Sequence, residues 1–412
     1  MKRLLSFLTA AVICAMCFSS CSGGKDDAGD TVGQGTTAEE TKQEETTYKE
    51  THISRVETDP HDYTASSPYG ICTWGDTVFY TEDSDFGKTI KYQNVKEPAE
   101  GGYTMYDETA AAEGKDPLSH MTDTSVIVDE KATAENGGAP VLLVATLYSE
   151  DHAVYGDDEL VIASYNTLSG EWSEIKRDKF DEEYLTINSL VLYRDTIFYT
   201  TFDGNTDMDV TIHRIGRDGG GYASLTDTAA SILLIHNDVI YYRGGGIYTC
   251  GLDFSGVAPF VSLEEDSMHV ELILDADDKG VYCMARQEDG ELRLCRFDPD
   301  DPSDYELVFD DYIYIILMRN GVAVYADLME GYLTGVAYAY DASTEKSRQI
   351  YDFSDRADEI MINPLVCESG YIVCEISNLP SLDLSSDDWY SQYESYIACI
   401  DTETGAELSR LS

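Results

Sequence analysis

Basic side chains are scarce in this sequence. Its 412 residues include 27 Lys and Arg against 78 Asp and Glu, which gives a formal net charge of -51. Proteins that bind nucleic acid gain affinity from cations that neutralise phosphates, and a polybasic surface that docks on anionic lipid needs the same charges. The scarcity excludes both classes. Because 43% of the residues are hydrophobic, the chain can still bury a core, so the charge belongs to a folded protein.

The motifs that mark common enzyme classes are also missing. The sequence contains no His-x-x-x-His or His-Glu-x-x-His pair for zinc, no Gly-x-Ser-x-Gly, no Walker loop and no Gly-x-Gly-x-x-Gly that follows a strand. The run Gly244–Gly246 leads into another apparent strand, which indicates a hairpin turn. A glycosidase, however, needs only two carboxylates from distant parts of the chain. Among 78 acids, spacing alone does not identify such a pair.

Long hydrophobic runs are absent except at the start of the chain. Lys2 and Arg3 precede an apolar stretch from Leu4 to Phe18, whose length of about fifteen residues fits a signal peptide and is short for a membrane span. The segment Phe18-Ser19-Ser20-Cys21 resembles the lipobox of bacterial lipoproteins, although Phe18 replaces the usual aliphatic residue. The resemblance implies that residues 1–21 are a lipoprotein signal and that Cys21 is acylated. An ordinary secretory peptide, with Cys21 as a plain cysteine, is the alternative.

Residues 22–65 have few aliphatic side chains and no hydrophobic periodicity. This composition of Gly, Ser, Thr and Glu predicts a disordered acidic tether. A flexible chain of this length has an r.m.s. span of about 35–40 Å. We therefore expect the lipid anchor to be the only membrane contact, with the globular part, residues 66–412, held on the extracytoplasmic side of the bacterial cell membrane.

After the tether, one pattern of sequence recurs. A polar turn leads into an alternating strand of aliphatic and aromatic residues, as in Asp76–Tyr80, Asp195–Tyr199 and Asp238–Tyr242. A short apolar run precedes each copy, and further alternating segments follow it. The apolar runs begin at Ile71, Ile127, Val191, Leu233, Ile273, Ile315 and Leu365. Four short strands in each repeat of about 40 to 45 residues are the unit of a β-propeller.

The predicted fold is thus all-β: a β-propeller of seven four-stranded blades, with six or eight blades or two β-sandwich domains as alternatives. Residues 107–124 interrupt the pattern and are expected to form an insertion, a short helix, outside the ring. The repeats resemble the Tyr-rich propeller repeats of bacterial surface lipoproteins and, more distantly, TolB-like and quinoprotein-like propellers. Asp401–Gly405 resembles the Asp-x-x-Thr-Gly turn of quinoprotein repeats. The Trp that usually follows this turn is absent from most copies, which argues against a quinone enzyme. Glu407–Leu411 is expected to be the outer strand of the last blade.

Seven cysteines follow Cys21, and no Cys-x-x-Cys motif occurs among them. Their odd number leaves at least one thiol unpaired within the chain. Cys283 with Cys295, and Cys374 with Cys399, fall on predicted second and third strands of a blade, where a cross-strand disulfide is conceivable. The simpler expectation is that all seven are small buried core residues.

One acidic loop is a candidate calcium site. Oxygen-bearing side chains occupy every second position of the loop, as at the start of a calcium loop; they belong to Asp203, Asn205, Asp207 and Asp209. Met208 and Arg214 stand where an EF-hand requires Gly and Glu, so this is no EF-hand. A solvated acidic hairpin is the alternative. No other cofactor is expected.

Aromatic residues mark a second candidate site. Trp389, Tyr390 and Tyr393 lie in a long insertion after Pro380, and aromatic residues in exposed loops are common at recognition surfaces. Packing of these rings against the last blade is the alternative.

These features predict a non-catalytic cell-surface lipoprotein whose propeller acts as a binding scaffold. Its longest loops, expected at 107–124, 149–158, 201–209 and 378–394, would face a protein or glycan ligand. No catalytic residue is assigned. The alternative is a propeller glycoside hydrolase or lyase that acts on cell-wall or dietary glycans.

Overall fold

A computed structural model describes most of the chain from Tyr63 onward. The chain divides into two units, residues 1–45 and 46–412, and every described residue belongs to the second. The described residues are 53, 63–66, 70–84, 87–97, 102–105, 121–148, 159–179, 185–203, 209–228, 231–244, 246–261, 269–287, 289–308, 314–319, 321–329, 332–354, 361–367, 370–378, 381–382 and 389–411. The predicted signal, Cys21 and most of the predicted tether therefore lie outside them.

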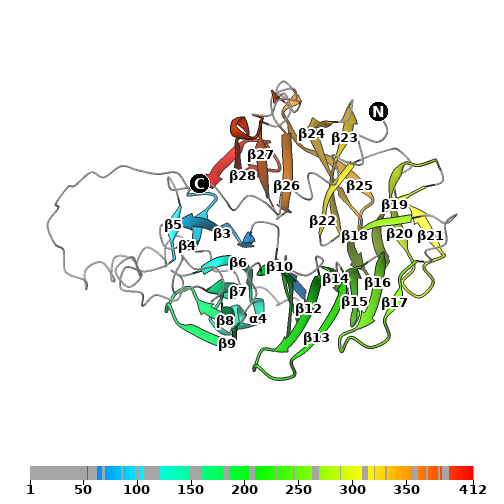
Figure 1. The fold of residues 1–412 in the computed structure, drawn as a ribbon. Helices are drawn as coiled ribbons and strands as arrows, with labels where there is room; N and C mark the ends of the chain where they lie inside the picture. Colours follow the sequence, from blue (N-terminus) through cyan, green and yellow to red (C-terminus); the bar gives the residue numbers. More distant parts are fainter. Residues whose placement is uncertain are drawn as a thin grey trace. The chain divides into compact units, whose positions relative to one another are not determined.

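Seven antiparallel four-stranded blades follow one another along the chain (Figure 1). Blade 1 comprises β2 (Cys72–Trp74), β3 (Thr77–Ser84), β4 (Gly87–Asn94) and β5 (Tyr103–Thr104). Blade 2 comprises β6 (Met121–Val128), β7 (Val141–Tyr148), β8 (Glu159–Asn166) and β9 (Trp172–Lys179). Blade 3 comprises β10 (Leu185–Tyr193), β11 (Thr196–Asp203), β12 (Asp209–Gly216) and β13 (Ala223–Thr228). Blade 4 comprises β14 (Ser231–His236), β15 (Val239–Arg243), β16 (Ile247–Gly251) and β17 (Ala258–Pro259).

The remaining blades repeat this order. Blade 5 comprises β18 (His269–Asp277), β19 (Gly280–Arg286), β20 (Leu292–Phe297) and β21 (Tyr305–Leu307). Blade 6 comprises β22 (Tyr314–Arg319), β23 (Val322–Met329), β24 (Tyr332–Asp341) and β25 (Lys346–Asp352). Blade 7 comprises β26 (Met361–Cys367), β27 (Tyr371–Ser377), β28 (Ser395–Asp401) and β29 (Glu407–Leu411). The predicted seven-bladed propeller is confirmed, and so is the predicted outer strand of the last blade.

The recurring aliphatic and aromatic strand of the sequence is the second strand of a blade. All seven residues of β27 are buried, whereas all three residues of β21, an outermost strand, are exposed. The second strand is covered on both faces because a neighbouring blade packs on each side of its sheet. Burial therefore decreases from the inner strands toward the outer edge of each blade.

Seven hydrophobic clusters of the described residues join each blade to the next. The cluster between blades 7 and 1 combines Val373 and Cys399 with Val78 and Tyr80. This last contact closes the ring without exchange of a strand between the first and last blades, since each blade is built from one continuous stretch of chain.

A polar contact also bridges every blade boundary. In ring order from the boundary of blades 1 and 2, these contacts are Trp74 Nε1 to Gly138 O (3.1 Å), Arg217 to Asp129, the Tyr193 hydroxyl to Asp238 Oδ1 (3.0 Å), Arg243 Nη2 to Glu271 O (3.3 Å), Gly321 N to Asp275 Oδ2 (2.8 Å), Arg348 Nη1 to Thr402 O (3.1 Å) and the Tyr371 hydroxyl to Gly75 O (2.9 Å). Apolar packing and hydrogen bonding thus follow the same ring.

Two elements lie outside the four-strand pattern. Strand β1 (Tyr63–Ala65), which the sequence places at the end of the tether, pairs with the inner strand β10. Helix α4 (Glu130–Glu135) lies between β6 and β7, and the Asp129 carboxylate caps it by accepting the Ala132 N–H at 3.0 Å.

The predicted insertion at 107–124 is shorter than expected, because residues 121–124 belong to β6; its remainder lies outside the described residues. No helix in the described part of the chain is long and apolar enough to cross a membrane.

Candidate functional site

The strand order gives the ring two different faces. Within each blade, the connection between the first and second strands and the connection between the third and fourth strands lie at the same end of the sheet. We call this end the turn face. The connection between the second and third strands, and the connection from each blade to the next, lie at the opposite end. We call this end the loop face. On the turn face, two residues join the first and second strands in blades 1, 3, 4, 5 and 6. Between β14 and β15 both residues, Asn237 and Asp238, have positive φ (48° and 65°), as a two-residue type I′ hairpin requires.

Three of the four longest connections between strands lie at the loop face; the fourth, residues 129–140 between β6 and β7, lies at the turn face and contains α4. Residues 105–120 connect β5 to β6, residues 149–158 connect β7 to β8, and residues 378–394 connect β27 to β28. They belong to blades 1, 2 and 7, which are neighbours in the closed ring. We refer to the loop face of these three blades as the candidate site.

The predicted aromatic site lies in the connection of blade 7. Trp389 and Tyr390 begin a short 3-10 helix, Trp389–Gln392. Tyr393 is half-buried, and its hydroxyl donates to Glu375 Oε1 at 3.1 Å. Burial and the nearby Glu375 raise the pKa of Tyr393. Tyr393 therefore packs back on the blade, as the alternative interpretation expected for this residue, and anchors the connection that carries the other two aromatic residues.

Asn378 fixes the two ends of the same connection. Its backbone N–H donates to Glu394 O at 3.0 Å, and its side-chain oxygen accepts the Glu394 N–H at 2.8 Å. The Asn378 amide also donates to Gln392 O at 2.7 Å. The long connection of blade 7 thus starts and ends at a base held by three hydrogen bonds.

The predicted calcium loop also joins strands at the loop face, in blade 3. Asp203 ends β11 and Asp209 begins β12, while Asn205 and Asp207 lie outside the described residues. Residues 201–203, which we expected in the loop, belong to β11. In the described part of the chain, no three His, Cys, Asp or Glu side chains form a group that could hold a metal. Calcium binding at this loop stays a prediction.

Six of the seven inner strands carry a register shift of the kind a β-bulge produces, and in five of them the shift lies near the loop-face end. The register shifts lie between Met121 and Asp123, Ile187 and Ser189, Ile232 and Leu234, Val270 and Leu272, Ile315 and Leu317, and Pro364 and Val366. A bulge inserts an unpaired residue and redirects the side chains beside it. The loop-face ends of five inner strands are therefore irregular, whereas the shift in β26 and a second shift in β18, between Ile273 and Asp275, lie nearer the turn face.

Asp123 is a residue at this end of the ring that the sequence did not single out. It lies beside the bulge of β6, is half-buried, and its carboxylate accepts the Ile187 N–H of blade 3 at 2.6 Å. Burial raises the pKa of this carboxyl, and the bond from Ile187 acts in the opposite direction. No sequence signal marked Asp123, because its hydrogen-bond partner, Ile187, is distant along the chain.

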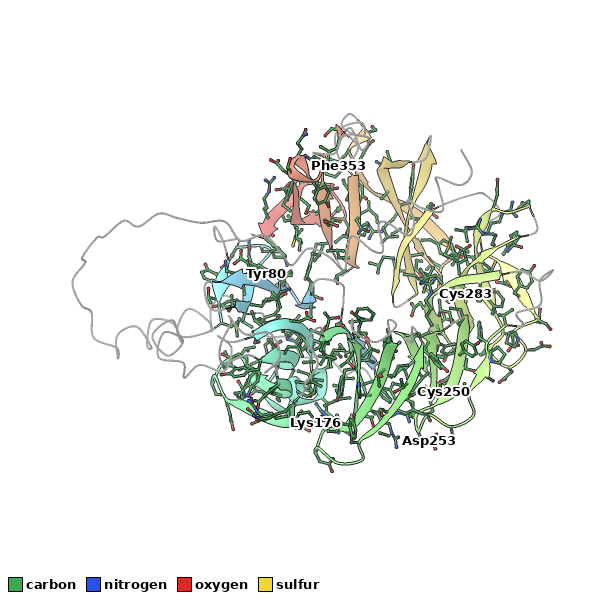
Figure 2. The ribbon with its side chains drawn as sticks, viewed as in Figure 1. Tyr80, Lys176, Cys250, Asp253, Cys283 and Phe353 are labelled. Carbon is green, nitrogen blue, oxygen red and sulfur yellow. The ribbon has the colours of Figure 1, made fainter. Side chains whose placement is uncertain are left out.

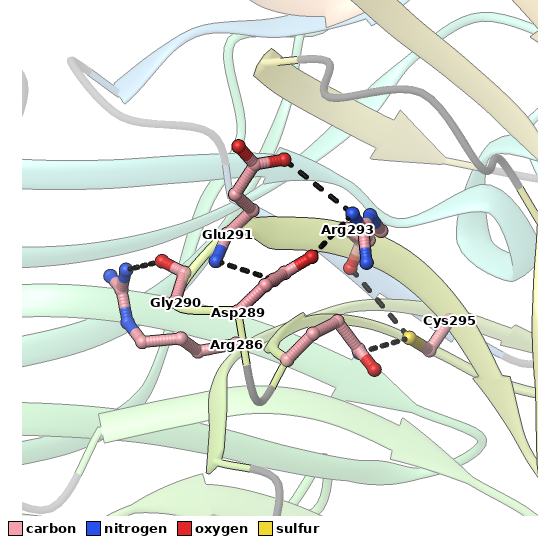
Figure 3. A network of polar contacts seen from close by, with 7 residues as sticks. Arg286, Asp289, Gly290, Glu291, Arg293 and Cys295 are labelled. Atoms are coloured by element: carbon pink, nitrogen blue, oxygen red, sulfur yellow. Dashed lines mark hydrogen bonds and ion pairs between the residues drawn. The ribbon is translucent and has the colours of Figure 1, made fainter.

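A polar network fixes the β19–β20 connection of blade 5, also at the loop face (Figure 3). Asp289 accepts the Glu291 N–H at 3.0 Å and pairs with Arg293 Nη2 at 2.7 Å. These two contacts hold the pKa of Asp289 below its usual value. Arg286 donates to Gly290 O at 2.6 Å. The charged groups of this connection mainly satisfy one another, which makes it a weaker candidate for ligand recognition.

A cluster of titratable groups lies between blades 2 and 3. His213 Nε2 lies 2.8 Å from Thr201 Oγ1, and its Nδ1 lies 2.9 Å from the Tyr222 hydroxyl. Lys176, labelled in Figure 2, lies over the Tyr222 ring with Nζ 3.7 Å from the ring centroid. Burial, with a smaller effect from Lys176, lowers the pKa of His213 to about 4. The sequence showed only a lone histidine here, since its partners come from other strands.

Six cysteines have described side chains, and all six are buried and form no disulfide: Cys72, Cys250, Cys283, Cys295, Cys374 and Cys399. Cys283 lies directly opposite Cys295, but Cys374 and Cys399 belong to different core clusters. Burial raises the pKa of Cys295 to about 11. The expectation of small buried core residues is confirmed for these six, and neither conceivable cross-strand disulfide is formed.

No protein-family model and no curated protein matches this chain. Among solved structures, it is similar to the β-propeller domain of the Trilobed protease from Pyrococcus furiosus, which is described as having an open velcro topology. That similarity has 13% identity and a TM-score of 0.48, and it covers 84% of this chain and 98% of the domain. A mutant of the Synechocystis apocarotenoid oxygenase matches with 12% identity and a TM-score of 0.37, over 83% of this chain and 70% of the oxygenase. Similarities at this level do not identify a reaction or a ligand.

Proposed function

We propose that this protein is a bacterial lipoprotein, anchored through Cys21, whose propeller binds a protein or glycan ligand outside the cytoplasm without catalysing a reaction. The observation that carries the proposal is the placement of three of the four longest connections on one face of three neighbouring blades, 7, 1 and 2. Loops held by a rigid scaffold commonly form binding surfaces. Here the scaffold is a ring closed by packing and by hydrogen bonds at every boundary.

A matched pair of photo-crosslinking positions in blade 7 tests the binding face. Gln392 is exposed at the loop face, and Glu403 is exposed at the turn face. A photoreactive residue replaces one or the other in the full-length protein, and intact cells are irradiated. We expect a discrete covalent adduct from position 392 and none from position 403. Equal adducts from both positions, or none from either, would contradict a loop-face binding site.

The anchor has a separate test. Cys21→Ser removes the thiol that would be acylated. Because the acyl chains on Cys21 are the proposed membrane anchor, the variant should move from the membrane fraction to the soluble extracytoplasmic fraction. A serine substitution at Cys72, which is buried in blade 1, serves as the control and should stay with the membranes. Retention of Cys21→Ser in the membrane fraction would refute the anchor.

The hydrolase alternative makes a different prediction about Asp123. A general acid needs a raised pKa, and burial gives Asp123 that property. Its oxygen, however, already accepts an inter-blade hydrogen bond, so we assign it a structural role. We expect no release of reducing sugar from purified cell-wall glycan by the wild-type protein. Release that Asp123→Asn abolishes would replace the binding proposal with a catalytic one.

A further inference from the structure

Blade 3 carries a fifth strand on the inner edge of its sheet. Residues Tyr63, Thr64 and Ala65 of β1 lie opposite Tyr193, Leu192 and Val191 of β10, in antiparallel register. Ser66 extends the pairing, because its N–H donates to Leu190 O at 2.7 Å and its Oγ accepts the Leu190 N–H at 2.9 Å. In the described part of the chain, no other inner strand is paired in this way with a segment from outside the blades.

The side chains of β1 fit the inner ends of three blades. Tyr63 packs against the cluster between blades 3 and 4 and also against the cluster between blades 4 and 5. Ala65 packs in the first of these clusters, and Thr64 is buried. Upstream, Ile53 is buried in the cluster between blades 1 and 2. Ile53 and Tyr63 therefore contact different blade boundaries.

The propeller is complete without this strand. Blade 3 has its own four strands, and the contact between blades 7 and 1 closes the ring. A pairing of only three residues is marginal by itself, but the short link to β2 keeps β1 at an effective concentration in the millimolar range. Main-chain pairing of this kind accepts other extended peptides, with pockets for alternate side chains that give specificity.

We propose that the inner edge of β10 is a docking site for an extended peptide segment of a partner protein, and that β1 occupies this site in cis as a displaceable competitor. The contacts of β1 define the segment: an aromatic residue, a small residue two positions later, and a hydroxyl residue after it. This docking site lies on blade 3, apart from the candidate site on blades 7, 1 and 2, so the inference goes beyond the proposed function and adds a peptide-binding site to it.

A peptide binding assay with the full-length protein tests the inference. The probe is a fluorescent synthetic peptide with the sequence of residues 60–68, Pro-His-Asp-Tyr-Thr-Ala-Ser-Ser-Pro. Tyr63→Ala weakens β1 in cis and leaves β10 intact, so this variant should bind the probe at least tenfold more tightly than the wild-type protein by fluorescence anisotropy. A probe with Ala in place of Tyr should bind neither protein. Tyr305→Ala, an exposed residue of β21, is the control and should match the wild type.

A cooperative thermal transition of each variant, followed by circular dichroism, shows that the ring is folded. Ser66→Ala removes only the acceptor for the Leu190 N–H and should increase probe affinity by a smaller factor, which keeps the test available if Tyr63→Ala fails to fold. A folded Tyr63→Ala or Ser66→Ala variant with wild-type affinity for the probe would overturn the inference. That result would leave the loop-face crosslinking experiment unaffected, and failure of the crosslinking would equally leave this assay unaffected.

Discussion

His213 has both ring nitrogens engaged within the cluster between blades 2 and 3. Burial first, and then Lys176, lower its pKa from 6.5 to about 4. The unfolded chain binds a proton near pH 6.5, so between pH 6.5 and 4 the unfolded state binds more protons than the native state. Stability therefore decreases as the pH falls through this window and reaches its lower limit below pH 4. Protonation would also give both nitrogens a hydrogen and so force a change in the bonds to Thr201 and Tyr222.

We predict that His213→Gln removes this part of the pH dependence. In the wild-type protein, the free energy of unfolding should fall by at most on the order of 3 kcal/mol between pH 6.5 and 4 because of His213, at about 1.4 kcal/mol for each pKa unit. Urea denaturation at a series of pH values measures it. Tyr222→Phe, which loses the hydroxyl bonded to Nδ1 but keeps the histidine, is the control and should retain the pH slope. The same slope in His213→Gln as in the wild type would show that another group causes it.

At the scale of elements, the turn between the third and fourth strands has one chemistry throughout the ring. In every blade an Asp or Asn side-chain oxygen accepts a backbone N–H two or three residues later. These residues are Asn94, Asn166, Asp218, Asp253, Asp301, Asp341 and Asp401. Such a bond mimics a backbone turn and is typical of Asx turns. Part of the acidic excess therefore has a structural role.

Asp401 shows what these bonds do to a carboxylate. Its Oδ1 accepts the Glu403 and Thr404 N–H groups, at 2.9 and 2.6 Å, and the Thr404 hydroxyl at 2.8 Å. The bonds from Thr404, followed by that from Glu403, lower the pKa of Asp401. The Asp401 carboxylate therefore stabilises the fold at pH values above its pKa in the unfolded chain, about 3.9. This stabilisation is lost as the pH falls through the lower pKa of Asp401 in the folded protein.

We predict that Asp401→Ala lowers the melting temperature of the protein by a few degrees at neutral pH, because three donors lose their acceptor. Asp401→Asn keeps an acceptor oxygen and should retain most of the stability. Glu403→Ala, in the same turn, is the matched control. Differential scanning calorimetry measures all three variants, and equal melting temperatures for Asp401→Ala and Asp401→Asn would refute the role of the acceptor.

The sequence predicted elements that are defined by their own residues. The second strands were visible because blades cover both of their faces, which favours apolar residues at most positions, as in β27, where only Glu375 and Ser377 are polar. Strand β1 was not predicted, because three residues, Tyr-Thr-Ala, are too few to show a hydrophobic alternation and the partner strand β10 is distant in sequence. The same reason hid Asp123 and His213, whose partners come from neighbouring blades or strands. Helix α4 was missed because six residues contain too little periodicity to show.

At the scale of the whole molecule, the contact between blades 7 and 1 holds the ring closed. The Tyr371 hydroxyl donates to Gly75 O at 2.9 Å, and the Tyr371 ring belongs to the cluster that joins these blades. We predict that Tyr371→Phe lowers the free energy of unfolding by about 1 kcal/mol, as expected for one hydrogen bond, and keeps a single cooperative transition. Tyr305→Phe, on the exposed outer strand of blade 5, should change neither quantity. Urea denaturation followed by tyrosine fluorescence measures both, and an unchanged stability of Tyr371→Phe would show that packing alone closes the ring.

The central claim is that the loop face of blades 7, 1 and 2 binds a ligand on the cell. Hydroxyl-radical footprinting of the protein on intact cells and of the purified protein compares the two states directly, with oxidation of each peptide quantified by mass spectrometry. We predict that the peptide that contains residues 378–394 of blade 7 is at least threefold less oxidised on cells, whereas Tyr305 and Leu307, which are exposed on blade 5, are oxidised equally in both states. Equal oxidation of residues 378–394 in the two states, or a matching decrease at blade 5, would contradict a binding site on this face.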